Sequence, residues 1–344
     1  LGTFRSVMVS SDGHDEKVLT VIGTPKDQIA KGFLKRDVLF GEEALKNRLA
    51  LNLFRPLEHG VIKDTAEDKK FIAHFINHMM NLADPEEYDR VVAVIGAPAE
   101  ASHVDKTAIF DAAAGTVNAC MIISEPFAVA YALDMLDHTM VVDIGGGTTE
   151  IAILSLGGVV YSNSMRVAGD SMDQAIISYM RKKYNLLVGE ASAEKIKKEI
   201  GTAFPTSDNT YLMKGRDIRS GTPKEISLRE EDTSEALQPI LSQILNAIKD
   251  ALENTPPELS ADLVDMGLTL TGGGSLLKNI DKLISKETGL PVMVADDPLA
   301  CVAIGTGKAL ENEDLTGFME TAMERKKLGG ELKSIAKKHG LSSY

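Results

Sequence analysis

The amino-acid sequence predicts an α/β fold built from two similar halves, and two observations lead to this prediction. Buried apolar runs alternate with helical patterns along most of the 344 residues, which is typical of parallel strands joined by crossover helices. One plan also occurs twice: a loop rich in glycine and threonine, a strand, a tight turn and a returning strand. We therefore expect an internally duplicated fold with one such loop in each half; the alternative is a chance similarity between two common hairpins.

The first half begins with one copy of this plan. Gly2 and Thr3 precede a strand at 4–9, a turn at 11–14 and a strand at 18–22. Residues 24–60 look irregular and polar, with a helical patch at 41–45, and predict an inserted subdomain. A helix at 69–82, an acidic turn at 83–89 and a buried strand at 91–96 follow. Ser102 and Asp105 then start a helix by the capping-box pattern.

Glu125 stands where a strand at 121–124 ends and a helix, expected over 127–136, begins. Ligand-binding loops of parallel sheets lie at the carboxyl ends of the strands, and the following Pro126 suits the first turn of a helix. A carboxylate at this place could order a water molecule. The alternative is an acid that only complements the helix dipole.

The second copy of the plan, at residues 139–161, is the clearest. Apolar runs at 139–142, 151–154 and 159–161 predict three strands, the last two joined by a glycine pair at 157–158. The loop after the first strand holds Asp143, Gly145, Gly146, Gly147 and Thr148. Its uncovered backbone N–H groups suit phosphate oxygens, and the Asp143 carboxylate suits a metal ion or a water beside them. The alternative is a tight glycine turn in an ordinary sheet.

Further elements follow in the second half. We expect a helix capped by Asp170, a short helix at 192–200 with Glu194 and Lys197 on one face, a turn at 214–217 and a long helix over 237–252. A strand at 268–271 leads into a third glycine-rich loop, which opens a helix from Leu276 and suits a flat ligand or a phosphate; it consists of Gly272, Gly273, Gly274 and Ser275. A strand at 291–295, a helix at 297–309 and a lysine-rich tail complete the chain.

Composition narrows the classes of function. The net charge of −13 argues against direct binding of nucleic acid. Cys120 and Cys301 lie in apolar surroundings and predict buried thiols in a reducing cytosol, with a disulfide left open. No apolar run approaches ~18 residues and no signal peptide is visible. The sequence starts at Leu1 without a methionine, so we expect further residues before Leu1 in the natural protein.

Five separated segments resemble the actin/Hsp70/sugar-kinase superfamily. Gly2-Thr3 resembles the end of its first phosphate motif, residues 142–150 its second, residues 271–275 its adenosine motif, and the helices after Pro98 and Pro298 its connecting helices. Within the superfamily the similarity is to bacterial actins. Residues 143–173, 194–197 and 214–217 resemble MreB, and residues 56–61 resemble both MreB and eukaryotic actin. Residues 23–27, 93–99 and 124–127 resemble the magnetosome actin MamK.

The resemblance implies a duplicated RNase H-like actin fold, with mixed sheets flanked by helices and a cleft that holds Mg²⁺ and ATP. Gly2 and Thr3 would contact the terminal phosphates, and Gly145, Gly146, Gly147 and Thr148 the β/γ region. Asp143 would orient the hydrated magnesium ion, and Glu125 would position the attacking water with help from Thr148. Glu194 and Lys197 would contact the ribose and base, and Gly272, Gly273, Gly274 and Ser275 the nucleoside.

The implied domain boundaries place residues 1–137 and 298–320 in lobe I, with an insert at about 24–60. Residues 138–297 form lobe II, with an insert at about 170–257, and residues 321–344 form a charged helical tail. The sequence also departs from the family. Phe4 and Arg5 replace smaller residues that usually follow Gly-Thr in MreB, and the acidic segment 83–87 stands where MreB tends to be basic or apolar. We therefore do not expect membrane attachment without an additional N-terminal segment.

The leading hypothesis is an actin-like ATPase that forms ATP-dependent cytoskeletal filaments in the cytoplasm, either a MamK-like magnetosome scaffold or an MreB-like one. Its partners would be further copies of the chain and an adaptor or organelle-surface protein. Two alternatives belong to the same superfamily: a small-molecule kinase, which needs an acid to deprotonate an acceptor hydroxyl, and a non-polymerising Hsp70-like ATPase. The sequence leaves the cargo and the filament geometry open.

Overall fold

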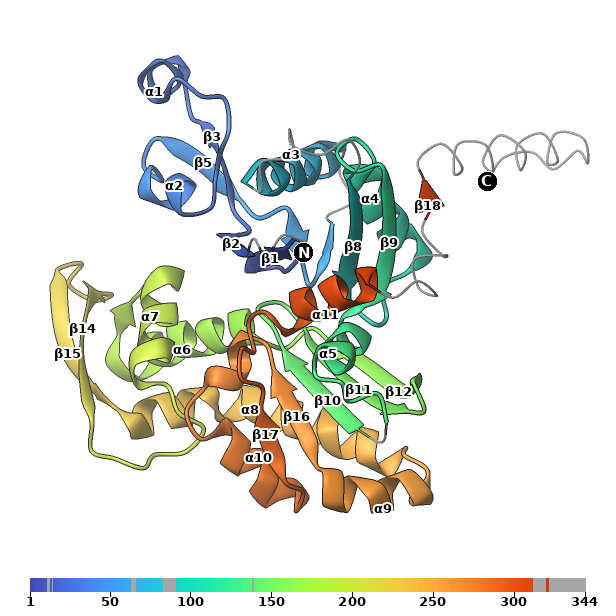
Figure 1. The fold of residues 1–344 in the computed structure, drawn as a ribbon. Coiled ribbons are helices and arrows are strands. Elements are labelled where there is room, and N and C mark those ends of the chain that lie inside the picture. The colour runs from blue at the N-terminus through green and yellow to red at the C-terminus, as the bar shows by residue number, and fades with distance from the viewer. Residues whose placement is uncertain are drawn as a thin grey trace, which may run out of the picture.

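The computed structural model describes residues 1–10, 13, 15–62, 66–82, 91–137, 139–311 and 320–321. Within these ranges the chain forms two lobes that face each other (Figure 1). The strands β1 to β9 belong to one lobe, here called lobe I, and β10 to β17 belong to the other, lobe II. Helix α11 (Cys301–Leu310) returns from lobe II to pack against α5 and β8. This is the two-lobed α/β arrangement that the sequence predicts.

Lobe II contains a five-stranded sheet in the order β12-β11-β10-β16-β17. Its central strand, β10, pairs with an antiparallel and a parallel neighbour and is buried at every residue, because apolar clusters cover both of its faces. The prediction of three strands at the central motif is confirmed. The bounds are β10 (Thr139–Ile144), β11 (Thr149–Ser155), β12 (Gly158–Met165), β16 (Leu268–Thr271) and β17 (Val292–Val294).

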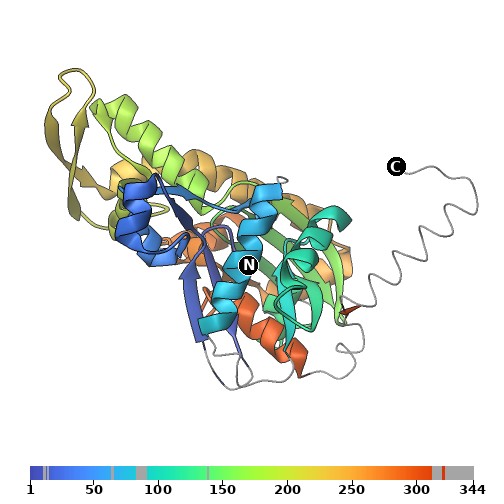
Figure 2. The same ribbon diagram turned by 90° about the horizontal axis from the view of Figure 1, so that it is seen from above.

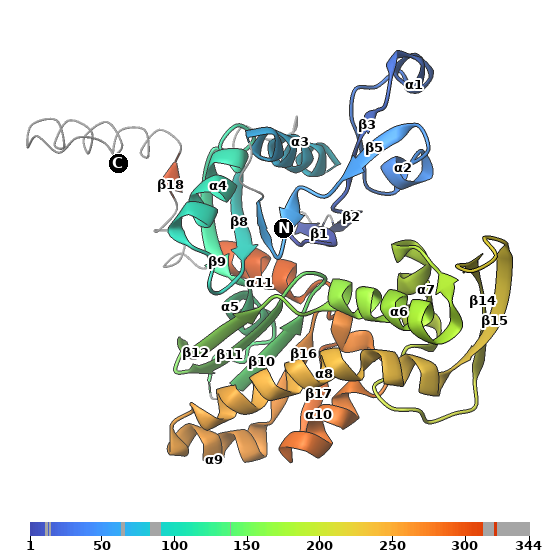
Figure 3. The same cartoon turned by 180° about the vertical axis from the view of Figure 1, so that it is seen from behind.

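Helices pack on the sheet of lobe II, and a small sheet, β13-β14-β15, extends from it (Figure 3). The long α8 covers the sheet with an apolar face that includes Leu237, Leu241 and Ile248. The bounds are α6 (Gly169–Tyr184), β13 (Leu186–Leu187), α7 (Glu190–Ile200), β14 (Thr210–Asp217), β15 (Pro223–Arg229), α8 (Glu230–Glu253), α9 (Pro257–Met266), η2 (Gly273–Leu276) and α10 (Ile280–Thr288).

Three expectations about lobe II are wrong in detail. Asp170 is not a cap, because α6 begins at Gly169 with Ala168 before it. Residues 214–217 continue strand β14 rather than turn, since this segment pairs with β15 as far as Pro223. The glycine-rich loop opens the short 3-10 helix η2, and the following α-helix starts only at Ile280, after Asn279 in the left-handed conformation.

Lobe I repeats the hairpin plan, but its described strands belong to four separate small sheets. β1 (Arg5–Val9) pairs antiparallel with β2 (Asp15–Leu19), and β8 (Val92–Ala97) pairs parallel with β9 (Ala119–Ser124), which also pairs with β18 (Glu320–Thr321). The expected return strand at 18–22 is therefore displaced toward the turn. The longer helices of lobe I are α3 (Ala66–Leu82) and α4 (His103–Ala113). Helix α5 (Glu125–Ala132) packs against α11 and against β10 and β11 of lobe II. The capping box of Ser102 and Asp105 is confirmed.

The insert at 24–60 is more regular than the sequence suggests. It contains a three-stranded sheet, β4-β3-β5, and two helices. Its small apolar core includes Leu39, Ala44 and Leu51. Its strands have two to four residues, so their periodicity is too brief to detect. The bounds are β3 (Ile22–Pro25), α1 (Gln28–Leu34), β4 (Leu39–Phe40), α2 (Gly41–Lys46) and β5 (Leu51–Phe54), followed by β6 (Leu57–Glu58) and β7 (Val61–Ile62).

Other expectations are decided only in part. Cys120 and Cys301 are both buried free thiols. In the portion of the chain that is described, every helix is too short or too polar to cross a membrane. The acidic turn at 83–89, most of the turn at 11–14 and almost all of the charged tail lie outside the described residues. The domain boundaries remain predictions.

Candidate functional site

A pocket of about 1610 Å³ lies between the two lobes, with residues of both in its wall. It extends from the glycine loops to the space between β1 and β8. Every predicted site residue lines it except Ser275: Gly2, Thr3, Glu125, Asp143, Gly145, Gly146, Gly147, Thr148, Glu194, Lys197, Gly272, Gly273 and Gly274. Seen from above, the elements of lobe I lie over those of lobe II (Figure 2).

The two predicted phosphate loops touch each other although they come from opposite lobes. A Cβ added to Gly147 would lie 2.6 Å from the Oγ1 of Thr3, and one added to Gly146 would lie 2.6 Å from the Cβ of Phe4. Glycine is therefore required at both positions, because real Cβ atoms do not approach other atoms so closely. The loops form facing walls of one site, as the duplicated plan predicts.

The segment before β7 braces this contact. The N–H of Gly60 donates to Thr3 Oγ1 at 2.7 Å, and His59 Nδ1 lies 3.0 Å from the carbonyl oxygen of Gly147. His59 and Gly60 both have positive φ, 51° and 74°. Both lie in the segment 56–61, which resembles MreB and actin, but their residue types alone predict no role. In the sequence, only Gly60 indicates a turn with positive φ at this position.

Helix α6 orients the second glycine loop from behind. Its first two residues, Gly169 and Asp170, donate backbone N–H groups to the carbonyls of Gly145 and Gly146, at 3.1 and 2.8 Å. The amine of Lys197 donates to the Gly169 carbonyl at 2.8 Å and pairs with Asp173 at 2.9 Å. Lys197 thus fixes the start of α6 at the pocket wall. Glu194, one turn earlier on α7, pairs with Lys198.

Three carboxylates lie near the second glycine loop, and two of them, Glu125 and Asp143, line the pocket. Glu125 is the first residue of α5, Asp143 ends β10, and Glu150 lies opposite Asp143 on β11. Burial, then the charges of Asp143 and Glu150, raises the pKa of Glu125 to about 8. Burial and Glu150 raise the pKa of Asp143 to about 7. Negative charge concentrated in a buried site favours a cation there.

The geometry of Asp143 fits a hydrated metal ion. Its side chain is 6% exposed, and its Oδ1 has no hydrogen-bond partner among the described residues. The described ranges contain no group of three acidic, histidine or cysteine side chains that could enclose a metal. A magnesium ion would accordingly rely on one carboxylate, water and phosphate oxygens, which is its usual preference.

The third glycine loop packs directly on the end of β10. A Cβ on Gly272, whose φ is +77°, would lie 2.2 Å from Asp143 Oδ1, and one on Gly274 would lie 2.3 Å from Ile144 Cγ2. The hydroxyl of Ser275 donates to the Gly272 carbonyl at 2.7 Å and is buried. Ser275 therefore closes the turn, whereas Gly272, Gly273 and Gly274 face the pocket.

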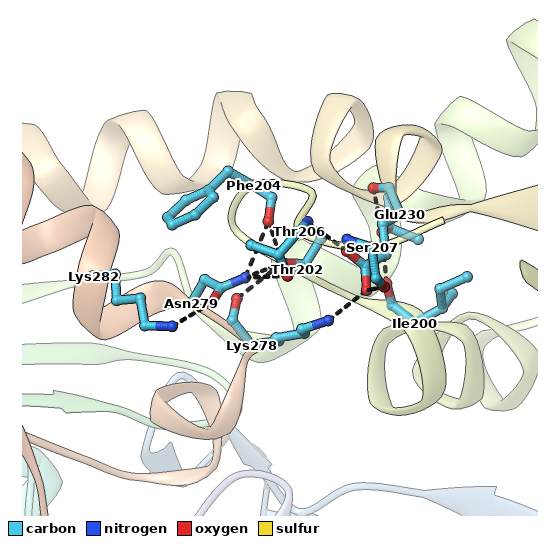
Figure 4. Close-up of polar contacts among 10 residues, drawn as sticks. Ile200, Thr202, Phe204, Thr206, Ser207, Glu230, Lys278, Asn279 and Lys282 are labelled. Carbon is cyan, nitrogen blue, oxygen red and sulfur yellow. Dashed lines mark hydrogen bonds and ion pairs between the residues drawn. The ribbon is translucent and has the colours of Figure 1, made fainter. Parts of the chain in front are cut away.

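A polar network fixes the far end of the pocket (Figure 4). The buried carboxylate of Glu230 accepts from the backbone N–H groups of Thr206 and Ser207 and from Lys278 Nζ. Asn279 Nδ2 donates to Thr202 Oγ1 at 3.1 Å. These contacts join the segment after α7 to the segment after the third glycine loop.

Comparisons with known proteins agree with this geometry. A family model described as MreB/Mbl protein matches residues 40–317. The cell shape-determining protein MreB of Escherichia coli (strain K12) is 42% identical over 303 residues, covering 86% of this chain and 85% of that protein. The structure of the MamK double helical filament is similar, with a TM-score of 0.84 and 27% identity over 91% of this chain and 97% of that one. MreB 5 of Spiroplasma citri bound to AMPPNP has a TM-score of 0.80 and 29% identity, over 92% and 97%.

Proposed function

The chain belongs to the MreB/Mbl family, and from this premise we propose that it is an actin-like ATPase that assembles into ATP-dependent filaments. The observation that carries the proposal is the contact between Thr3 and Gly147, which brings glycine loops of opposite lobes together. Such loops suit the phosphate chain of one nucleotide. The structure of a relative bound to AMPPNP supports the same placement.

We assign the predicted roles to the residues on this basis. Gly2, Thr3 and the loop 145–148 would hold the phosphates, and Asp143 would hold hydrated magnesium, which neutralises charge when bound. Glu125 would orient the attacking water with Thr148, because it is buried at the same end of the pocket. Hydrolysis of a phosphoanhydride depends mostly on such positioning and charge neutralisation.

The two ends of the molecule suit head-to-tail assembly of identical chains. At the tip of lobe I, Ile29, Phe33 and Leu49 are 85%, 80% and 87% exposed, among basic residues such as Lys26 and Lys31. At the opposite end (Figures 1 and 3), α9 exposes Val264 and Met266 beside Glu258 and Asp265. One apolar patch is surrounded by basic residues and the other by acidic residues. This favours contact between the tip of lobe I in one copy and α9 in the next. A contact of this kind does not close on itself and generates a filament.

Among filament-forming relatives, the MreB type is better supported than the magnetosome type. The curated relatives at about 40% identity are named cell shape-determining proteins, whereas the MamK structures are 27% identical or less. We therefore propose an MreB-like scaffold. Adaptor proteins, a cytoplasmic location and the lack of membrane attachment without an additional N-terminal segment remain predictions.

Sedimentation and electron microscopy with ATP and Mg²⁺ test the proposal. We expect polymer with ATP and less polymer after hydrolysis to ADP. Phe33→Asp should abolish sedimentation, whereas Val104→Asp, at a similarly exposed apolar residue of α4, should not. A folded wild-type chain that binds ATP but never sediments would contradict the filament proposal and would favour a non-polymerising ATPase.

A further inference from the structure

Glu150 is a buried carboxylate that joins the two lobes and that the roles assigned above do not include. Its side chain lies on β11, and the residue is 1% exposed. Oε1 accepts a hydrogen bond from the Ser164 hydroxyl of β12 at 2.6 Å, within lobe II. Oε2 accepts from the backbone N–H of Ala99 at 3.0 Å, and Ala99 belongs to lobe I.

The contact with Ala99 continues to the phosphate loops. Ala99 follows Pro98 in the loop after β8. Pro98 packs against Gly60, where an added Cβ would lie 2.5 Å from the proline ring. The N–H of Gly60 donates to Thr3 Oγ1 at 2.7 Å, and Thr3 packs on Gly147. Glu150 is therefore one end of a chain of contacts that encloses the phosphate end of the pocket.

Burying a carboxylate only to make a structural contact is energetically unfavourable. Removing this charge from water is unfavourable unless hydrogen bonds compensate, and burial raises the pKa of Glu150. An uncharged amide could bond to the same two partners, because its oxygen would accept from the Ala99 N–H and its nitrogen would donate to the hydroxyl oxygen of Ser164. A buried acid with a raised pKa beside a pocket is a candidate for a functional role.

We propose that Glu150 is a positioning residue for nucleotide hydrolysis. It would hold residues 98–99 of lobe I at a fixed position relative to the second glycine loop of lobe II. Through the contacts of Pro98 with Gly60 and of Gly60 with Thr3, it would keep Thr3 opposite Gly147. The position of Thr3 would in turn set the position of the terminal phosphate relative to Glu125. The inference rests on the proposed ATPase function. It assigns Glu150 no contact with the nucleotide, so its loss should slow the chemical step and leave binding nearly unchanged.

Two substitutions of similar size separate the hydrogen bond from the bulk of the side chain. Glu150→Gln keeps an acceptor for Ala99, whereas Glu150→Met fills the same space without one. With Met we expect the single-turnover rate, measured per bound ATP, to fall about 10- to 100-fold, the effect of a small misplacement of reacting groups. With Gln we expect less than about a threefold decrease. The Kd for ATP should change by less than about threefold in both.

Thr255→Val provides a matched control, because Thr255 is also buried and its hydroxyl donates to the Ala251 carbonyl at 2.7 Å, at the α8–α9 end far from the pocket. It should hydrolyse ATP as the wild type does. Counting turnover per bound nucleotide removes any loss of folded protein from the comparison. Equal hydrolysis rates for Glu150→Met and the wild type would overturn the inference about Glu150 but not the ATPase proposal. The same holds if Glu150→Met loses ATP affinity and hydrolysis rate to the same extent. A wild-type chain that binds but never hydrolyses ATP would overturn the ATPase proposal as well.

Discussion

The buried acids at the phosphate end of the pocket predict an unusual dependence of stability on pH. Without nucleotide or metal, the pKa of Glu125 is raised by burial and by Asp143 from 4.5 to about 8, and that of Asp143 by burial from 3.8 to about 7. A carboxyl whose pKa is raised in the folded state binds its proton more tightly there than in the unfolded chain. Its contribution is therefore most favourable below its unfolded pKa and declines as pH rises through its folded pKa.

The size of the effect follows from these values. Between pH 6 and pH 8, linkage gives a loss of about 2 kcal/mol for Glu125 and about 1 kcal/mol for Asp143. The free energy of unfolding should therefore fall by about 3 kcal/mol over this interval. His78 opposes the trend by less than about 1 kcal/mol, because burial lowers its pKa and its contribution is lost as pH falls.

Urea unfolding in EDTA at pH 6, 7 and 8 measures this difference. The control is the double variant Glu125→Gln with Asp143→Asn, which retains His78 and every other titrating group. The wild type should lose about 3 kcal/mol more than the double variant between pH 6 and 8. Magnesium with ATP should reduce the loss, since a bound cation favours the ionised carboxylates. Equal slopes for the two proteins would refute the assignment of a buried acidic pair.

Three substitutions test other parts of the account. Glu125→Ala should lower steady-state ATP hydrolysis by about 10²- to 10⁴-fold while filaments still form and persist, which phosphate release and pelleting would show; normal phosphate release would remove Glu125 from its role. Gly147→Ala should weaken ATP binding at least about tenfold in calorimetry, since its Cβ would displace Thr3, and unchanged affinity would place the phosphates elsewhere. Gly272→Ala should destabilise the protein by more than about 3 kcal/mol in urea unfolding, against about 1 kcal/mol for Gly289→Ala; both have positive φ, but only Gly272 lies against Asp143. Equal losses for the two variants would show that the backbone of the third loop can relax.

Much of the fold could be predicted because its elements are long and strongly patterned. The buried strand before Asp143 and the capping box at Ser102 both follow from local sequence. Short or exposed elements could not be predicted in the same way. The insert sheet has strands of two to four residues. The end of β14 contains Gly215 and Asp217, residue types that are common in turns, although this segment is paired as a strand.

The glycine loops of the candidate site could be predicted from the sequence. The contacts between residues far apart in the chain could not. The three glycine loops and Asp143 stand out in the sequence, and the structure brings them to one pocket. The link from Glu150 to Ala99 spans 51 residues and crosses between lobes, so no local pattern reveals it. The role of Ser275 in closing its own turn also depends on backbone geometry, which residue type alone does not specify.

The central claim is that glycine loops of opposite lobes enclose the phosphates of one nucleotide. Isothermal titration calorimetry of the folded chain with ATP and Mg²⁺ tests it most directly. We predict saturable binding of one ATP per chain, strongly weakened in Gly147→Ala. Absence of binding by the folded wild type, with both adenine and guanine nucleotides at millimolar concentration, would contradict the claim.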